Sequence, residues 1–188
     1  MAPSCLLFYV GVNKRLNNIE HHNLFFDESL EEHGKEIYKN PQWPSSPLFY
    51  LCAPSVTDKS VAPKGCENLF FLMPIAPDLA DSEANREKYF KILLKRLEKR
   101  TGNDISDNIV YKKSFCIDDF KNEYNAFKGN AYGLANTLKQ TAVFKPSMRN
   151  KKLKNFYYTG QLTIPGPGVP PSIISGEVVS KYILNNHN

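Results

Sequence analysis

The arrangement of apolar and polar residues predicts a chain built from short strands and a few helices. Residues 5–12 form an almost continuous apolar run, closed by Gly11 and Asn13, which is typical of a buried strand. A second run at residues 22–26 is expected to pair with the first as a hairpin, across the polar segment between them. Further strands are predicted by the runs at residues 48–52, 68–75 and 109–115.

The clearest helical pattern covers residues 83–100. Four large apolar residues recur at i, i+3, i+4 and i+7, the spacing of one helical face: Phe90, Leu93, Leu94 and Leu97. Asp81 or Ser82 before the pattern fits an N-cap, and Gly102 after it fits a C-cap glycine. Shorter helices are expected over residues 27–38 and 118–124.

The order of these elements predicts an α+β fold, because strands that follow one another closely form an antiparallel sheet and the helices between them cover one face of it. After residue 150 the pattern changes to a short strand, a glycine- and proline-rich loop and a helix. We therefore expect one domain over residues 1–150 and the beginning of a second over residues 151–188.

Length and composition exclude several classes of protein. The 188 residues are 41% hydrophobic and 23% charged, which is the balance of a globular protein and not of a disordered or collagen-like chain. No apolar run approaches the roughly 20 residues that a membrane-spanning helix requires. The first residues also lack the basic and small-residue pattern of a secretory signal, so we expect a cytoplasmic protein.

Charge is distributed unevenly along the chain. Residues 1–76 hold six basic and eight acidic side chains, whereas residues 77–188 hold eighteen and eleven. Residues 139–154 alone contain six cations and no anion. A solvated basic face is the simplest interpretation, and an anionic membrane surface is the next. Nucleic acid is not expected as a partner, because the run lacks interleaved aromatic residues for base stacking.

The cysteines and histidines do not form a recognisable metal motif. The four cysteines are far apart and include no C-x-x-C pair: Cys5, Cys52, Cys66 and Cys116. The adjacent His21 and His22 are expected to point to opposite faces of a strand, so that they would not share an ion. The sequence therefore predicts no metal site, and reduced thiols.

The glycine- and proline-rich segment near the end of the chain is the one most typical of a ligand site. Residues 156–159 are apolar and aromatic, which predicts a short strand, and residues 160–168 form the loop after it. Pro170 or Pro171 fits the first position of the helix that follows. The positive end of that helix can hold a phosphate or the electron-rich edge of a ring. A purely structural turn explains these residues equally well on physical grounds.

Seven blocks of sequence, in order along the chain, carry a resemblance to known proteins: residues 51–58, 62–68, 73–77, 118–120, 128–133, 140–142 with Pro146, and 157–180. Together they resemble the bacterial-type phytoene desaturases, which belong to the FAD-dependent carotenoid desaturases and amine-oxidase-like flavoproteins. Proteins of this family begin with a strand, a glycine-rich turn and a helix that hold the ADP half of FAD, and this sequence contains no such segment. The resemblance therefore implies the C-terminal part of a larger enzyme, whose FAD-binding, Rossmann-like domain is mostly absent here.

The resemblance also implies which residues lie near the cofactor and the substrate. The residues that match the flavin-contacting loop are Gly160, Gln161, Pro167, Gly168, Val169 and Pro170. By the same resemblance, Tyr132 and Leu134 lie near the flavin and shape the end of the substrate tunnel. The sequence demands no catalytic acid or base, so we expect no catalytic side chain in this chain.

The function implied by the resemblance is an FAD-dependent desaturation, in which hydride passes from a linear carotenoid to the flavin and a C=C bond forms. A polyene lies in the bilayer, so the enzyme is expected at the membrane periphery, held there by the basic run at residues 139–154 and the helix at residues 83–100. Two alternatives remain open. The same scaffold can act on another polyene, as a hydroxycarotenoid desaturase, an isomerase or a saturase, and a complete chain of this length would instead be a non-catalytic lipid-binding module.

Overall fold

The computed structural model describes residues 1–135, 137–141 and 144–187. Ala142, the last residue of the family block at 140–142, lies outside the described residues. The chain forms two compact units, residues 3–129 and residues 130–188 together with the first two residues. We call them the sheet unit and the C-terminal unit. They meet in sequence earlier than the expected domain boundary near residue 150, and the functional assignment of the two domains stays a prediction.

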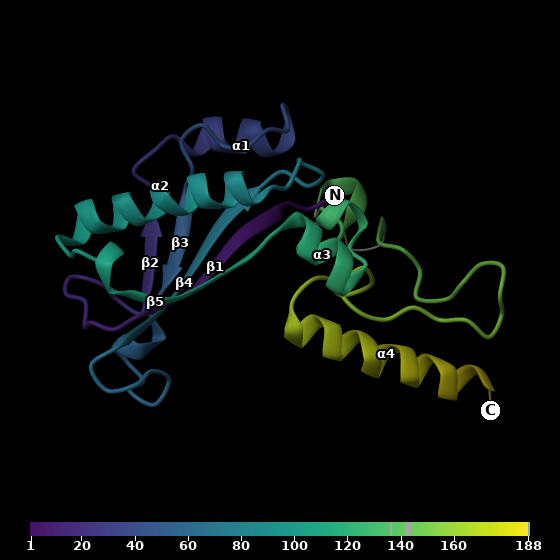
Figure 1. The fold of residues 1–188 in the computed structure, drawn as a ribbon. Coiled ribbons are helices and arrows are strands. Elements are labelled where there is room, and N and C mark those ends of the chain that lie inside the picture. The colour runs from purple at the N-terminus through teal and green to yellow at the C-terminus, as the bar shows by residue number, and fades with distance from the viewer. Residues whose placement is uncertain (136, 142–143, 188) are drawn as a thin grey trace. The chain divides into compact units, whose positions relative to one another are not determined.

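The sheet unit has the α+β fold that the sequence predicts. Its five strands form one antiparallel sheet in the order β2-β3-β4-β1-β5. The strands are β1 (Ser4–Val12), β2 (His22–Phe25), β3 (Phe49–Cys52), β4 (Glu67–Ile75) and β5 (Ile109–Phe115). The helices are α1 (Leu30–Tyr38), α2 (Glu83–Thr101) and α3 (Ile117–Tyr124). In Figure 1, α1 and α2 lie over the same side of the sheet.

The expected hairpin between β1 and β2 is wrong. β2 pairs instead with β3, from His22 opposite Cys52 to Phe25 opposite Phe49, while β1 pairs with β4 on one side and with β5 on the other. β1 has nine residues, nearly all buried, and therefore needs a partner along both edges. β2 has only four residues, three of them outside the core, and suits the edge of the sheet.

The core lies between the sheet and α2. The four residues of the helical pattern are all buried, as the spacing predicts: Phe90, Leu93, Leu94 and Leu97. Phe90 packs on Phe8 of β1, with ring centroids 4.9 Å apart. The caps are also as predicted, because the Ser82 hydroxyl accepts from the amide of Asn85 at 3.2 Å and Gly102 adopts φ +72°. Since the apolar stripe of α2 is buried, only its cationic outer face is available to a membrane.

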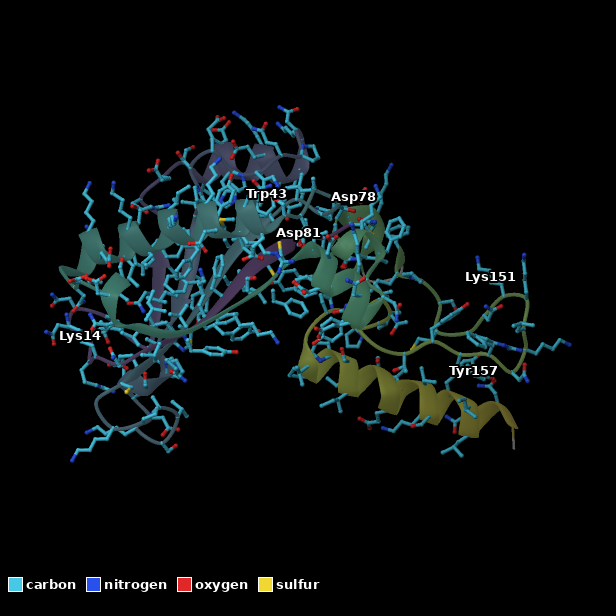
Figure 2. All side chains as sticks on the ribbon, in the orientation of Figure 1. Lys14, Trp43, Asp78, Asp81, Lys151 and Tyr157 are labelled. Carbon is cyan, nitrogen blue, oxygen red and sulfur yellow. The ribbon has the colours of Figure 1, made fainter. Side chains whose placement is uncertain are left out.

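An aromatic contact holds the proline-rich loop after α1 onto α2. Trp43 stacks on Tyr89, with ring centroids 5.0 Å apart, and its indole N–H donates to the carbonyl of Ala80 at 3.1 Å. The Tyr89 hydroxyl donates in turn to the carbonyl of Pro44 at 2.7 Å. Figure 2 marks Trp43 beside these helices. A loop rich in proline is thus fixed by side chains, since its own backbone has few donors.

In its described residues the C-terminal unit has one α-helix, α4 (Val169–His187), and a short 3-10 helix at Leu138–Gln140. The strand expected at residues 156–159 is wrong: Tyr157 forms only an isolated bridge with Arg149. A strand needs a neighbour along its length, and a single bridge shows that the described part of this unit offers none at that point. Residues 144–168 are a succession of turns, on which Figure 2 marks Lys151 and Tyr157.

Candidate functional site

The face of the sheet opposite α1 and α2 is apolar and partly exposed. On this face the strand register also places His22, Cys52 and Lys113. We call it the open sheet face, and its large apolar residues are Tyr9, Leu24, Tyr50, Phe70, Leu72 and Tyr111. Leu24, Tyr9 and Tyr111 are exposed, and the other three are half-buried. Cross-strand pairs join them into one surface, since Tyr9 lies opposite Phe70 and Tyr50 opposite Leu72. An ordinary one-sided sheet carries polar residues on its outer face, so an aromatic outer face indicates a binding surface.

A hollow of about 250 Å³ lies on the open sheet face. Its walls include Tyr9, Phe70 and Tyr111, and the rings of Tyr9 and Phe70 are 5.2 Å apart. At Gly11 a side chain would come within 3.3 Å of Tyr111, so a glycine there lets β5 and the tyrosine approach closely. Burial raises the pKa of the Tyr9 phenol, which therefore stays neutral. This lining suits a flat apolar ligand.

In the C-terminal unit, the loop at residues 160–168 is fixed to α4 by a buried serine. We call this segment the glycine–proline loop. Ser175 is fully buried, and its hydroxyl accepts from the amide of Gly160 and lies within hydrogen-bond distance of the Thr159 hydroxyl, both at 2.7 Å. The Thr163 hydroxyl donates to the carbonyl of Gly160 at 2.9 Å. The small residue in the middle of the helix thus holds the start of the loop in place.

The glycine–proline loop ends at the first turn of α4, which is open to solvent. Gly168 has φ +115°, a conformation that L side chains rarely adopt. Val169 is 74% exposed, and Pro170 is also exposed. Because Pro170 and Pro171 have no N–H, the backbone donors that this helix end can present are those of Gly168 and Val169. That is fewer donors than a helix N-terminus without proline has, but they lie at the positive end of a 19-residue helix.

The turn at residues 130–134 packs against the glycine–proline loop. A side chain at Gly133 would meet Leu162 at 2.6 Å, and the Gly133 amide donates to the Asn130 carboxamide at 2.5 Å. Tyr132 is 41% exposed, and Leu134 is half-buried. The structure therefore brings together two segments, 25 or more residues apart in sequence, that the family resemblance assigns to one site.

The remaining candidate residues of the glycine–proline loop differ in exposure. Gln161 is exposed, while Gly160 and Pro167 are half-buried. None of the three carries an ionisable side chain, so any contact with a ligand would use the backbone or the Gln161 carboxamide. The arrangement can bind and orient a ligand, and it offers no acid or base.

Lys145 is a neighbour of this loop that the sequence does not predict. It belongs to the basic run, for which we expect solvated side chains, yet it is only 8% exposed. Its Nζ lies 3.2 Å from the position that a side chain at Gly166 would take. No acidic residue occurs between Glu123 and Glu177, so the whole segment is electropositive. A charge this close to the loop favours an anionic ligand.

A basic hollow of about 630 Å³ lies on the same unit. Lys145, Arg149, Lys151 and Lys152 contribute to its walls. Apart from Lys145 these cations are exposed, as expected for the basic run. Among the helices that the structure describes, none is long and apolar enough to cross a bilayer.

The prediction that His21 and His22 point apart is wrong. Their rings are 4.2 Å apart, centroid to centroid. The alternation of side chains applies only within a strand, and β2 begins at His22, so that His21 lies in the bend before it.

Comparison with known proteins gives close matches along the whole chain. No family model matches it. The carotenoid 3,4-desaturase of Haloarcula japonica is 44% identical over 185 residues, which are 98% of this chain and 37% of that protein. The 4,4'-diapolycopen-4-al dehydrogenase of Metabacillus indicus is 32% identical over 186 residues, 99% of this chain and 38% of that protein. The lycopene-forming phytoene desaturase of Pantoea ananas is 30% identical over 190 residues, again 99% and 38%.

The chain therefore spans somewhat more than a third of the length of these curated relatives. Several relatives are named as desaturases, and others as a 4,4'-diapolycopen-4-al dehydrogenase and a 4,4'-diapolycopene oxygenase. With identity of this extent over nearly all of its residues, the chain is homologous to the corresponding part of carotenoid desaturases.

Proposed function

We propose that the chain is part of an FAD-dependent carotenoid desaturase, an oxidoreductase that introduces C=C bonds into a linear, phytoene-like carotenoid. The observation that carries the proposal is the packing of the 130–134 turn on the glycine–proline loop, next to the exposed positive end of α4. Desaturases and dehydrogenases of carotenoids among the relatives support the same reaction class. A non-catalytic lipid-binding module is not favoured, because these relatives are named as enzymes.

The residues present fit one part of a flavin site. Gly168 leaves the position just before α4 free of a side chain, Lys145 adds positive charge, and no carboxylate lies between Glu123 and Glu177 in the sequence. FAD, when bound, supplies the acceptor for the hydride that leaves the substrate. The backbone of the glycine–proline loop and the donors of Gly168 and Val169 would orient the ring and stabilise negative charge on it. We further assign this loop and α4 to a Rossmann-like FAD-binding domain.

The open sheet face is the proposed wall for the polyene. A long hydrocarbon gains roughly 25 cal/mol for each Å² removed from water, so binding needs apolar area more than polar contacts. Tyr9, Phe70 and Tyr111 provide this area around a hollow, and the neutral Tyr9 phenol adds no charge. We propose that Tyr132 and Leu134, beside the glycine–proline loop, contact the substrate near the flavin.

Contact with an anionic membrane surface is part of the proposal, because the substrate dissolves in lipid. The exposed cations around the basic hollow, Arg149, Lys151 and Lys152, are accompanied by the exposed apolar side chains of Phe144 and Leu153. Each lysine or arginine near such a surface contributes about 1 kcal/mol. Binding to vesicles that contain anionic lipid should therefore weaken as salt is added, and equal binding to neutral vesicles would contradict the electrostatic part.

The exposed apolar side chains of α4 support a further part of the proposal, a partner surface from the FAD-binding domain. Ile173 is 70% exposed and Leu184 62% exposed, although a helix of this composition is normally covered. The relatives are more than twice as long as the residues that align with this chain. We propose that the remaining domain covers this helix.

The test is to express the complete coding sequence that contains this chain in bacterial cells that accumulate phytoene, and to separate the extracted pigments by chromatography. We expect phytoene to be replaced by coloured, more desaturated carotenoids. The purified protein should carry FAD, seen by its absorbance. A protein that binds FAD but leaves phytoene unchanged would point to another polyene, and a protein without FAD would contradict the cofactor.

Two variants connect the activity to the proposed site. Gly168→Val forces a branched side chain into a φ of +115° and should remove bound FAD, whereas Leu138→Ala, at an 89% exposed position, should retain it. Tyr132→Ala should change the distribution of products while FAD remains bound. Unchanged rate and product distribution would remove Tyr132 from the substrate site.

A further inference from the structure

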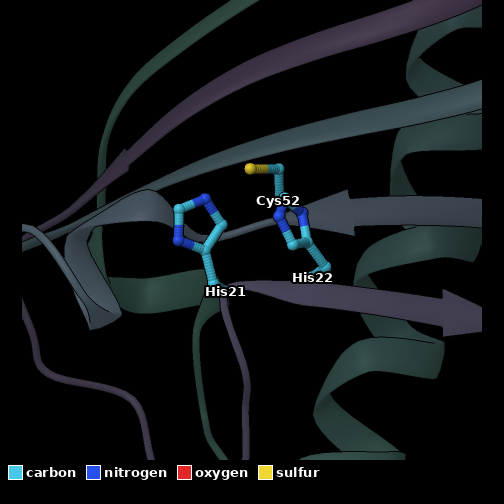
Figure 3. A group of neighbouring side chains, drawn as sticks. All are labelled: His21, His22 and Cys52. Atoms are coloured by element: carbon cyan, nitrogen blue, oxygen red, sulfur yellow. The ribbon is translucent and has the colours of Figure 1, made fainter.

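Two histidines and a cysteine converge at the edge of the sheet, next to Tyr50 of the open sheet face and outside the residues that line its hollow. Figure 3 shows His21 just before β2, His22 at the start of β2 and Cys52 on the neighbouring β3. The strand register places His22 directly opposite Cys52, and the amide of Ala53 donates to the carbonyl of His21 at 2.8 Å. One ligand atom from each of the three side chains lies within 4.8 Å of the others.

Hydroxyl groups hold both imidazoles from one side. Nδ1 of His21 is 2.6 Å from the Thr57 hydroxyl, and Nδ1 of His22 is 2.6 Å from the Tyr50 hydroxyl. When Nδ1–H donates to the hydroxyl oxygen, Nε2 carries the lone pair that a metal ion needs. This is the arrangement by which outer groups select the tautomer of metal-binding histidines.

Tyr50 also links the two strands. Its hydroxyl forms a hydrogen bond with the Cys52 side chain and another with Nδ1 of His22. Tyr50 therefore lies between His22 and the thiol as a hydrogen-bonding neighbour of both. The side of the three residues that faces away from Tyr50 and Thr57 is open to solvent, because His22 is exposed and both His21 and Cys52 are half-buried.

We propose that His21, His22 and Cys52 bind a zinc ion, with solvent in the fourth position. A thiolate with two imidazoles is a donor set that suits Zn²⁺ and discriminates against Mg²⁺ and Ca²⁺, which prefer oxygen. Zinc–nitrogen and zinc–sulfur bonds of about 2.1 and 2.3 Å separate tetrahedral ligands by roughly 3.5 Å. The present spacing of up to 4.8 Å closes to this value by small side-chain rotations, since two of the three residues precede or begin an edge strand.

The ion would join the beginning of β2 to the end of β3. The described β2 has only four residues, so its hydrogen bonding to β3 is limited. A metal ion that joins His22 to Cys52, the first residue pair of the two strands, would stabilise this edge of the sheet. The proposal does not depend on flavin or polyene binding, and it assigns no reaction to the ion.

The test is a titration of the untagged 188-residue chain with Co²⁺, which replaces Zn²⁺ and reports thiolate ligation by a charge-transfer absorption band. We expect one ion per chain, and displacement of the band by Zn²⁺. Cys52→Ser should abolish the band, and His21→Ala or His22→Ala should weaken binding by more than the roughly 10- to 100-fold typical of losing an outer group. Cys66→Ser is the matched control, because Cys66 is half-buried like Cys52 but lies outside the cluster.

A second measurement needs no variant. Zn²⁺ should protect Cys52, and not Cys66, from alkylation by iodoacetamide, as read by peptide mass mapping.

The groups around the ion give two further expectations. Tyr50→Phe should weaken zinc binding about 10-fold, because it removes a group that orients His22. Lower pH should weaken zinc binding further, because the thiol and the imidazoles must lose protons to bind the ion. Absence of the band, a band that survives Cys52→Ser, or equal alkylation of the two cysteines would overturn the proposal. Since no flavin is present, none of these outcomes bears on the proposed desaturase activity.

Discussion

The sheet unit and the C-terminal unit keep their structure by different means. In the sheet unit, apolar side chains from β1 to β4 and from α2 form one continuous core, and Ile109 of β5 packs against it. In the described part of the C-terminal unit, the buried hydrophobic residues are Val179 and, from the start of the chain, Ala2. Its other buried side chains are mostly polar: Asn130, Lys145, Thr163 and Ser175.

This contrast indicates how each unit contributes to a site. A unit with its own core can present a rigid surface, such as the open sheet face, and tolerate changes on it. A unit held by hydroxyl and amide contacts can place backbone groups accurately, but it leaves apolar residues such as Ile173 uncovered. Substitutions in the two units should therefore differ in how much stability they remove and in how far through the molecule the effect spreads.

The largest effect is expected in the core of the sheet unit. Phe71 is fully buried and lies beside the rings of Phe49 and Phe90. Phe71→Ala should lower the free energy of unfolding by about 3–5 kcal/mol, because it removes apolar contacts and leaves a cavity. Ile173→Ala, at a 70% exposed position of α4, should change it by less than about 0.5 kcal/mol. Urea unfolding followed by circular dichroism measures the free energy of unfolding of both variants. Similar losses of stability in the two variants would contradict the difference between the two units.

The next effect concerns a buried ion pair at the start of α2. Arg86 bonds to Asp81 at 2.6 Å and to Asp119 at 2.8 Å, and the Asp81 side chain is 1% exposed. Arg86→Ala leaves the Asp81 carboxylate buried without its cation, which should cost about 3 kcal/mol at neutral pH. Lys91→Ala, whose side chain on the same helix is 74% exposed, is the control and should cost little.

The pH dependence of the same pair has a definite sign. Burial alone would raise the pKa of Asp81, but hydrogen bonding and charge from Arg86 hold it below its usual value. Because the folded pKa is lowered, this carboxylate stabilises the fold above about pH 4 and loses that contribution as pH falls further. The difference in free energy of unfolding between the Arg86→Ala variant and the original protein should therefore become smaller as pH falls. If this free-energy difference stayed constant from pH 7 to about pH 3, the Asp81 carboxylate would not be the cause of the lost stability.

A smaller effect is expected at the last residue of the sheet unit. Gly129 has φ +61°, and a side chain there would come within 2.5 Å of the Ile117 carbonyl oxygen. Gly129→Ala should cost about 2 kcal/mol, from backbone strain and a clash with a main chain that cannot move aside. Gly65→Ala, with φ +85° but no atom within 4 Å, carries the strain alone and should cost less. Equal thermal shifts for the two variants would rule out the clash.

The smallest effect is expected in the C-terminal unit. Ser175→Ala leaves the amide of Gly160 without its acceptor, which should cost about 1 kcal/mol. Since this unit has few buried apolar contacts, the loss should appear as faster hydrogen exchange at Gly160 and not as a lower global stability. Ser180→Ala, whose exposed hydroxyl bonds only within α4, is the control. Unchanged exchange at Gly160 would mean that the serine does not hold the glycine–proline loop.

Local patterns were sufficient to predict most of the elements but not all of their partners. α2 and β5 begin as predicted, because periodicity, caps and apolar runs are properties of neighbouring residues. The pairing of β2 with β3 depends on which strand already occupies each edge of β1, and no local signal contains that.

The candidate site shows the same limit. The glycine–proline loop and the helix after it were predicted from glycine, proline and small residues, whereas the burial of Lys145 against Gly166 was not. That contact joins residues about twenty apart through a series of turns without periodicity. The approach of His21 to His22 was missed because one of them lies outside the strand, and strand boundaries are the least certain part of a prediction.

The absence of acids around the glycine–proline loop also has a consequence for handling the protein. The C-terminal unit holds seven basic side chains and one acidic one, a difference of +6, and its Glu177 is already paired with Lys181. Charges that find no counterpart within the unit recruit counterions from the buffer. In a cell extract, polyanions such as nucleic acids would compete for these positions until salt displaces them. The protein should therefore bind to a heparin column through the C-terminal unit and elute at moderate ionic strength.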